Sequence, residues 1–135
     1  MIQVFCDGGS RGNPGPAAYG FVVCQNGLLI KEGAGYIGIA TNNFAEYTAL
    51  IKALTWLSRS FARRDLDFFL DSLLVVMQVS GKYKVKNAKI RELLAHVRQL
   101  ETSFGQIRYH HIERSQNEHA DKLVNLALDN HAQKI

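Results

Sequence analysis

Four acidic residues stand where their side chains could converge on one site. Asp7 and Asp71 each follow an apolar run, in "VFCD" and "FFLD". Glu46 and Asp121 fall in segments of helical periodicity, beside the apolar stripe, so both should border a core. Gathered carboxylates repel one another and raise each other's pKa unless a cation lies among them, and their hard oxygen atoms suit Mg²⁺ or Mn²⁺. The four acids therefore predict a divalent-metal site.

The elements that must position these acids can be predicted from hydrophobic periodicity. The predicted strands are 2–5, 19–24, 28–36, 66–70 and 106–112, and the predicted helices are 43–61, 72–79, 88–101 and a last one from about 117. Asn26-Gly27 predicts a tight hairpin turn, and Asn43 is expected to cap the first helix. The order βββαβααβα predicts an α/β fold in which helices flank a five-stranded mixed sheet, with three strands antiparallel and two parallel.

Ligands of such sheets bind beyond the carboxyl ends of parallel strands. Strand 66–70 should run parallel to strand 2–5, which would put Asp7 and Asp71 at the same edge of the sheet. A single acid at a strand end is more typical of a turn or a cap. Two acids at adjoining strand ends favour a shared site instead.

Length and composition indicate a single domain over residues 1–135, because 47% of the residues are hydrophobic and can form a sizeable core. No apolar stretch approaches the roughly 20 residues that span a bilayer, and the N-terminus lacks the pattern of a signal peptide. We therefore expect a soluble, cytoplasmic protein. Cys6 and Cys24 lie in apolar runs and are expected to be buried free thiols.

Basic residues exceed acidic ones and favour a polyanionic partner. The chain has 16 Lys and Arg against 12 Asp and Glu, a net charge of +4, and setting the four site acids aside leaves 16 against 8, near +8. The segment 82–91, "KYKVKNAKIR", holds five basic residues and no acid. Such a run is typical either of a solvated loop or of a surface that follows nucleic-acid phosphates.

Four stretches of the chain resemble, in order, the four sequence blocks of type 1 ribonuclease H. They are "DGGSRGNPGPAAYG", "TNNFAEYTALIKAL", "LDSLLVV" and "NEHADKLVNLA". The resemblance implies a ribonuclease H-like fold and an endoribonuclease that cuts the RNA strand of RNA/DNA hybrids, leaving 3′-hydroxyl and 5′-phosphate ends. It also implies two Mg²⁺ ions per site, with Mn²⁺ as a substitute. Asp7 and Asp71 would be shared ligands, and Glu46 and Asp121 would each complete one metal.

The same resemblance implies a set of substrate-binding residues, with the RNA/DNA hybrid as the partner. No membrane contact is expected, and no protein partner is implied. In the glycine-rich segment after Asp7, bare backbone would let ribose hydroxyls approach closely, and asparagines would bond to bases and sugars in the minor groove. A second group would contact the DNA strand, with Thr41 and Asn87 gripping a phosphate and Tyr83 or its neighbouring lysines packing on the strand. The first group is Gly8, Gly9, Ser10, Asn13, Asn42 and Asn43, and the second is Thr41, Asn87, Tyr83, Lys84 and Lys86.

The chain departs from the family pattern at three places. It lacks the long basic protrusion before "VKN", it has Leu73 where many members have a glutamine that touches substrate, and it is too short for the usual histidine loop before the last helix. Arg114 resembles an arginine found near that position in short members and would aid the attacking water or product release. His119 lies two residues before Asp121, about 200° around a helix, and is expected to be a surface residue. His110 and His111 are expected to be structural.

Three other functions remain open from the sequence. One is a catalytically weak module of this fold that only binds nucleic acid, although the intact acid set argues against it. Another is an assembly domain of the kind attached to polymerases. The third is a nuclease that also cuts double-stranded RNA.

Overall fold

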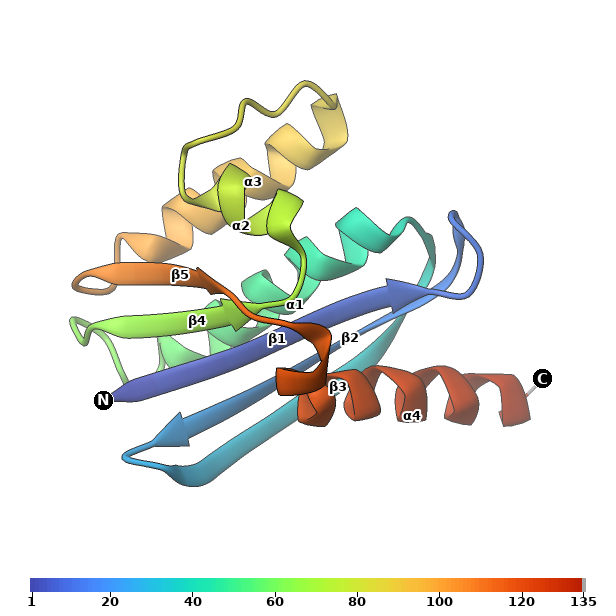
Figure 1. The fold of residues 1–135 in the computed structure, drawn as a ribbon, viewed down its shortest axis with the longest axis horizontal. Coiled ribbons are helices and arrows are strands. Elements are labelled where there is room, and N and C mark those ends of the chain that lie inside the picture. Colours follow the sequence, from blue (N-terminus) through green and yellow to red (C-terminus); the bar gives the residue numbers. More distant parts are fainter. Residues whose placement is uncertain (135) are drawn as a thin grey trace.

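Helices cover both faces of a five-stranded sheet in the computed structural model of the chain, which describes residues 1–134 (Figure 1). The strands are β1 (Ile2–Ser10), β2 (Gly15–Gln25), β3 (Leu28–Ala40), β4 (Leu66–Leu70) and β5 (Ile107–His111). The helices are α1 (Asn42–Leu57), α2 (Leu73–Val79), α3 (Ala88–Glu101) and α4 (Glu118–Lys134), and a 3-10 turn, Arg114–Gln116, precedes α4. The predicted order βββαβααβα is confirmed.

The strands lie in the order β3-β2-β1-β4-β5. β1, β2 and β3 are antiparallel neighbours, whereas β4 is parallel to β1 and β5 is parallel to β4, as predicted. Asn26 and Gly27 have φ values of 52° and 80°, and a two-residue hairpin needs positive φ at both positions. The predicted turn between β2 and β3 is therefore confirmed.

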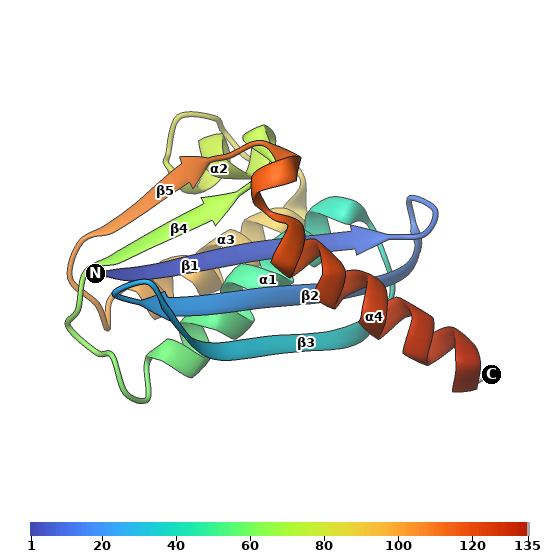
Figure 2. The same ribbon diagram turned by 60° about the horizontal axis from the view of Figure 1, so that its bottom comes forward.

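The two faces of the sheet are covered differently (Figure 2). α1 lies against one face and buries Tyr47, Leu50, Leu54 and Leu57 completely. α3 packs beside α1, and α4 lies on the opposite face, over β1, β2 and β3. Among residues 1–134, no helix is both long and apolar enough to cross a bilayer.

β1 is longer than predicted, because its pairing with β2 continues from Ile2 to Ser10. Asp7 therefore lies inside a strand rather than at its end. The pairing of β1 with β4 stops earlier, at Phe5 opposite Phe69, so Asp7 does lie beyond the parallel region.

α1 begins and ends earlier than predicted. Thr41, not Asn43, is the N-cap, and its Oγ1 accepts a hydrogen bond of 3.2 Å from the backbone N–H of Phe44. The helix ends at Leu57, with Ser58 as C-cap, rather than near residue 61. Both cysteines are free, but only Cys6 is buried. Cys24 is half-buried and lines a small cavity with Asn117 and His119, at the start of α4.

Gly8 allows α1 to lie against β1. A Cβ atom at Gly8 would lie 2.2 Å from the carbonyl carbon of Ala45, a backbone atom of α1 that cannot move aside alone. A Cβ atom at the neighbouring Gly9 would come no closer than 3.8 Å to Val124, an ordinary contact.

We expect Gly8→Ala to lower the free energy of unfolding by about 3 kcal/mol or more, because α1 must shift from the sheet to admit the methyl group. Gly9→Ala is the matched control and should change it by less than about 1 kcal/mol. Urea denaturation of both variants measures the difference. Equal free energies of unfolding for Gly8→Ala and Gly9→Ala would mean that α1 can shift away from β1 at little cost.

Candidate active site

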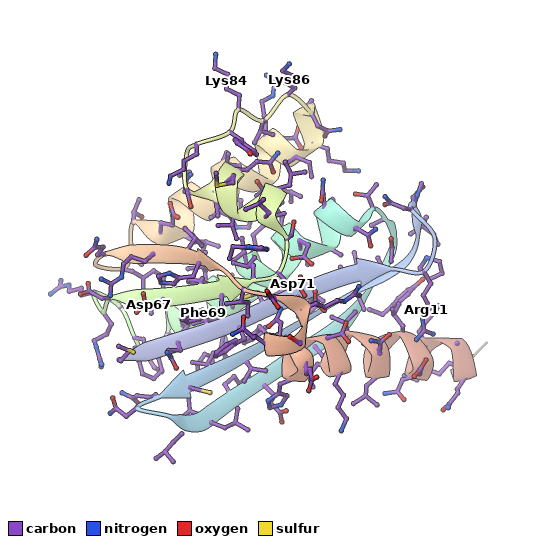
Figure 3. The ribbon with its side chains drawn as sticks, in the orientation of Figure 1. Arg11, Asp67, Phe69, Asp71, Lys84 and Lys86 are labelled. Carbon is purple, nitrogen blue, oxygen red and sulfur yellow. The ribbon has the colours of Figure 1, made fainter. Side chains whose placement is uncertain are left out.

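The parallel register of β1 and β4 brings three acids together. Phe5 pairs with Phe69, and Asp7 and Asp71 lie two residues beyond this pair on β1 and after β4. Glu46 reaches the same point from the second turn of α1. One oxygen of each of these three carboxylates lies within 4.8 Å of the others. In Figure 3, Asp71 lies just past the end of β4, near the middle of the molecule.

Asp121 joins this group from the other face of the sheet. It lies in the first turn of α4, where its charge raises the pKa of Asp7. All four acids line one open cavity of about 370 Å³. The predicted convergence of the four carboxylates is therefore seen in the structure.

Burial and repulsion disfavour the charged forms of two of these acids, Asp7 and Glu46. Burial raises the pKa of Asp7 to about 7, and the charge of Asp71 adds to this effect. Burial, with the charge of Asp7, also raises the pKa of Glu46. The backbone N–H of Gly8 donates a 3.0 Å hydrogen bond to Glu46 Oε1, which offsets part of the increase.

The donor set fits a divalent cation. Glu46 Oε2 is buried and has no hydrogen-bond partner among residues 1–134. A buried carboxylate oxygen without a partner is costly unless a ligand satisfies it. Three carboxylates within reach of one another supply the hard oxygen atoms that Mg²⁺ or Mn²⁺ takes. The cluster therefore indicates use of a divalent metal.

Arg114 lies at the rim of the same cavity. Its side chain is 83% exposed, and its Nη2 lies 3.9 Å from Asp121 Oδ1. The guanidinium group is thus close to the acids and still open to a ligand. The structure brings it to the predicted site.

The histidines lie away from the acid cluster. His119 pairs with Glu32 of β3, on the α4 face of the sheet. His110 is bonded to Asp67 at 2.9 Å and stacks on Phe69, with 4.9 Å between ring centroids. His111 is exposed. None of the three lines the cavity, which agrees with their expected surface and structural positions.

Predicted substrate-binding asparagines hold the β1–β2 loop against the start of α1. Asn13 Oδ1 accepts a hydrogen bond of 3.0 Å from the Asn42 N–H, and Asn42 Oδ1 accepts one of 2.9 Å from the Ser10 N–H. These bonds use the acceptor oxygens, so the side-chain amide N–H groups are left to donate to a ligand. The cavity is lined by Gly8, Gly9, Ser10, Asn42 and Asn43 but not by Asn13.

Thr41 and Asn87 occupy equivalent places on two neighbouring helices. Each is an N-cap, Thr41 of α1 and Asn87 of α3. Lys89 Nζ lies 5.5 Å from the ring centroid of Phe44, so the two helix starts are close together. Helix N-termini carry partial positive charge and attract phosphate groups.

Tyr83, Lys84 and Lys86 lie on the exposed segment between α2 and α3. Figure 3 shows Lys84 and Lys86 projecting outward, away from Asp71. The structure does not bring these residues to the acid cavity. Contact with them would require a ligand that extends beyond it.

Sequence reasoning missed Asn117 and Arg11. Asn117 is 1% exposed, and its Nδ2 donates a 2.9 Å hydrogen bond to the carbonyl of Cys6, which holds the start of α4 beside Asp7. Arg11, labelled in Figure 3, lines the cavity. It forms a 2.6 Å ion pair with Asp129 of α4. Asn117 stands inside the block "NEHAD", which was a usable signal, but nothing in the sequence pairs Arg11 with Asp129.

Comparisons with known proteins agree with this geometry. The family described as "Reverse transcriptase-like" matches residues 5–127. The chain is 43% identical over 129 residues to the Ribonuclease HI of Halobacterium salinarum, covering 95% of this chain and 64% of that protein. It is 41% identical over 134 residues to the Bifunctional protein Rv2228c of Mycobacterium tuberculosis, covering 98% of this chain and 36% of that protein. The chain thus spans less than two thirds of either relative.

A solved structure matches nearly the whole fold. The crystal structure of LC11-RNase H1 in complex with RNA/DNA hybrid has a TM-score of 0.93 and 38% sequence identity. The match covers 98% of this chain and 99% of that one.

In the presence of chelator, the free energy of unfolding should fall as pH rises from about 4 to about 7. The folded-state pKa of Asp7, about 7, lies above its ordinary value of 3.8, so between these values the folded chain keeps a proton that the unfolded chain has released. Asp71→Asn removes a neighbouring charge and lowers the pKa of Asp7. The pH profile of the free energy of unfolding should be flatter for Asp71→Asn than for the native chain. Near pH 7 the variant should be more stable, by about 1.4 kcal/mol for each unit by which the pKa of Asp7 falls.

Urea denaturation at a series of pH values measures both profiles. Asp129→Asn is the control, because it removes an acid that is paired with Arg11 on the α4 surface instead of one in the cluster. Parallel profiles for the native chain and Asp71→Asn would contradict the repulsion described here.

Proposed function

We propose that this chain, which belongs to the type 1 ribonuclease H family, hydrolyses the RNA strand of RNA/DNA hybrids. The observation that carries the proposal is the cluster of Asp7, Glu46 and Asp71 within 4.8 Å, with Asp121 beside it. The relatives named ribonuclease H, and the related structure that holds an RNA/DNA hybrid, support the choice of substrate.

The four acids would hold two Mg²⁺ ions, with Mn²⁺ as a substitute. Bound divalent ions would neutralise the scissile phosphate, activate the attacking water and stabilise the leaving oxygen. From the family resemblance, Asp7 and Asp71 would be shared ligands. Glu46 and Asp121, which come from α1 and α4, would each serve one ion. In hydrolysis the water oxygen joins phosphorus as the bond to O3′ breaks, which leaves 3′-hydroxyl and 5′-phosphate ends.

Residues around the acids would position the hybrid. The backbone at Gly8, Gly9 and Ser10 would admit ribose hydroxyls, which mark the RNA strand. The amide N–H groups of Asn13, Asn42 and Asn43 would donate to base and sugar acceptors in the minor groove. The neighbouring N-caps Thr41 and Asn87 would hold a DNA phosphate at two helix starts.

A cleavage assay tests the proposal on labelled hybrid, double-stranded RNA and double-stranded DNA, each with Mg²⁺, Mn²⁺ or chelator. We expect cutting of the RNA in the hybrid, none of the double-stranded DNA, and complete loss of activity with chelator. Asp71→Asn should abolish turnover and remain folded. Binding of hybrid without cleavage in either metal would favour a binding module instead, and cutting of double-stranded RNA would widen the substrate range.

Arg114→Ala should lower turnover by roughly tenfold to a hundredfold, because the variant no longer places a permanent cation near the reacting phosphate. His119→Ala is the control and should change turnover by less than about threefold, since His119 pairs with Glu32 away from the cavity. Single-turnover rates on hybrid measure both. A larger effect for His119→Ala would show that the reaction uses the opposite side of α4.

Lys84→Ala/Lys86→Ala should weaken hybrid binding and flatten its salt dependence by up to about 0.9 for each phosphate that the variant no longer neutralises. The exposed position of both lysines suits contact with a long duplex rather than with the cavity. Binding is measured by anisotropy in chelator over a range of salt concentrations. An unchanged slope would place both lysines away from the substrate.

A further inference from the structure

A second groove lies between α1 and β3, away from the acid cavity. It has a volume of about 410 Å³ and shares no lining residue with that cavity. α1 and α4 lie on opposite faces of β2 and β3 (Figure 2). The groove is on the α1 side, because its lining includes Lys52, Thr55 and Trp56 of α1. From Glu46 to Trp56 the helix rises about 15 Å.

Aromatic rings form the floor of this groove because β3 has glycines opposite them. Phe21 pairs with Gly33, and Tyr19 pairs with Gly35. A Cβ atom at Gly33 would lie 2.1 Å from the Phe21 ring, and one at Gly35 would lie 2.9 Å from the Tyr19 ring. The two rings therefore lie across the backbone of β3.

Three basic side chains surround the rings. Lys31 Nζ lies 5.6 Å from the Trp56 ring centroid, and Lys52 Nζ lies 5.8 Å from the Tyr19 ring centroid. Arg59 also lines the groove and is exposed. Within the part of the chain that the structure describes, none of the three forms an ion pair within 4 Å.

The acidic residue of the lining, Glu32, forms no ion pair with these three cations among the described residues. Glu32 is bound to His119 of α4, on the opposite face of the sheet. The groove therefore combines a partly exposed Trp56, two further aromatic rings and an unpaired positive charge.

We propose that this groove binds single-stranded nucleic acid. Bases stack on aromatic side chains while basic residues follow the phosphates, and such sites bind strands with little regard to sequence. Lys31 and Lys52 lie over the rings of Trp56 and Tyr19 and would move off them as bases stack there. The two lysines and Arg59 would then meet phosphates. The site does not use the acid cluster, so strands bound in it are not cut there.

The chain carries a built-in reporter for this site, because Trp56 is its only tryptophan. The probe is an oligothymidylate of about ten nucleotides, within the range of single-strand site sizes. It has no ribose hydroxyl and is used with chelator, so the result does not depend on the proposed hydrolysis. Binding at low salt should quench the emission of Trp56 and saturate.

Lys52→Glu/Arg59→Glu should weaken this binding by about tenfold or more and flatten its salt slope by about 1.4, which corresponds to two phosphate contacts. Lys122→Glu/Lys134→Glu makes the same charge change on exposed residues of α4 and should weaken binding by less than about threefold. A blunt RNA/DNA hybrid should not displace the oligonucleotide.

Several results would overturn the proposal. They are absence of quenching at low salt, binding that leaves Trp56 emission unchanged, equal weakening by both double variants, and displacement by the blunt hybrid. Displacement would place the single strand at the acid cavity instead.

Discussion

β1 and β4 run parallel with Phe5 opposite Phe69, and this register decides where the carboxylates meet. Beyond it, Asp7 and Asp71 leave the paired region at the same level, and α1 brings Glu46 to the same point. Side chains alternate along a strand, so a slip of one residue would turn one of the two aspartates to the other face of the sheet. The chemistry of the site therefore depends on fully buried apolar residues such as Val4 and Phe68, which fix the register.

The carboxylate cluster works against stability, and the rest of the fold must tolerate it. Burial and repulsion raise the pKa values of Asp7 and Glu46, and Glu46 Oε2 has no hydrogen-bond partner in the described chain. The close contact of Gly8 with α1 keeps the acids from moving apart, because the helix backbone lies directly on the strand. Functional sites commonly retain such unfavourable interactions where a ligand relieves them. Here the ligand that would relieve them is a divalent cation.

Features set by local chemistry could be predicted from the sequence. The Asn26-Gly27 turn, the apolar stripe of α1 and the parallel strand at 66–70 all follow from short patterns, and the four acids follow from their sequence blocks. Features set by distant contacts could not. The backbone N–H of Asn42 donates to Asn13, 29 residues away, and this bond fixes the start of α1 at Asn42. Thr41, rather than Asn43, is therefore the N-cap. Likewise, the bond from Asn117 to Cys6 joins residues 111 positions apart, and only the fold brings them together.

The four acids come from elements on both faces of the sheet, so the site is completed late in synthesis. A domain folds as a unit, and synthesis supplies its N-terminal segments first. β1, α1 and β4 carry Asp7, Glu46 and Asp71, whereas Asp121 comes with α4, the last helix of the described chain. Asn117 must also find the Cys6 carbonyl before α4 can lie beside Asp7. Synthesis therefore supplies three of the four acids well before the fourth, and the acid set is complete only when the final helix docks.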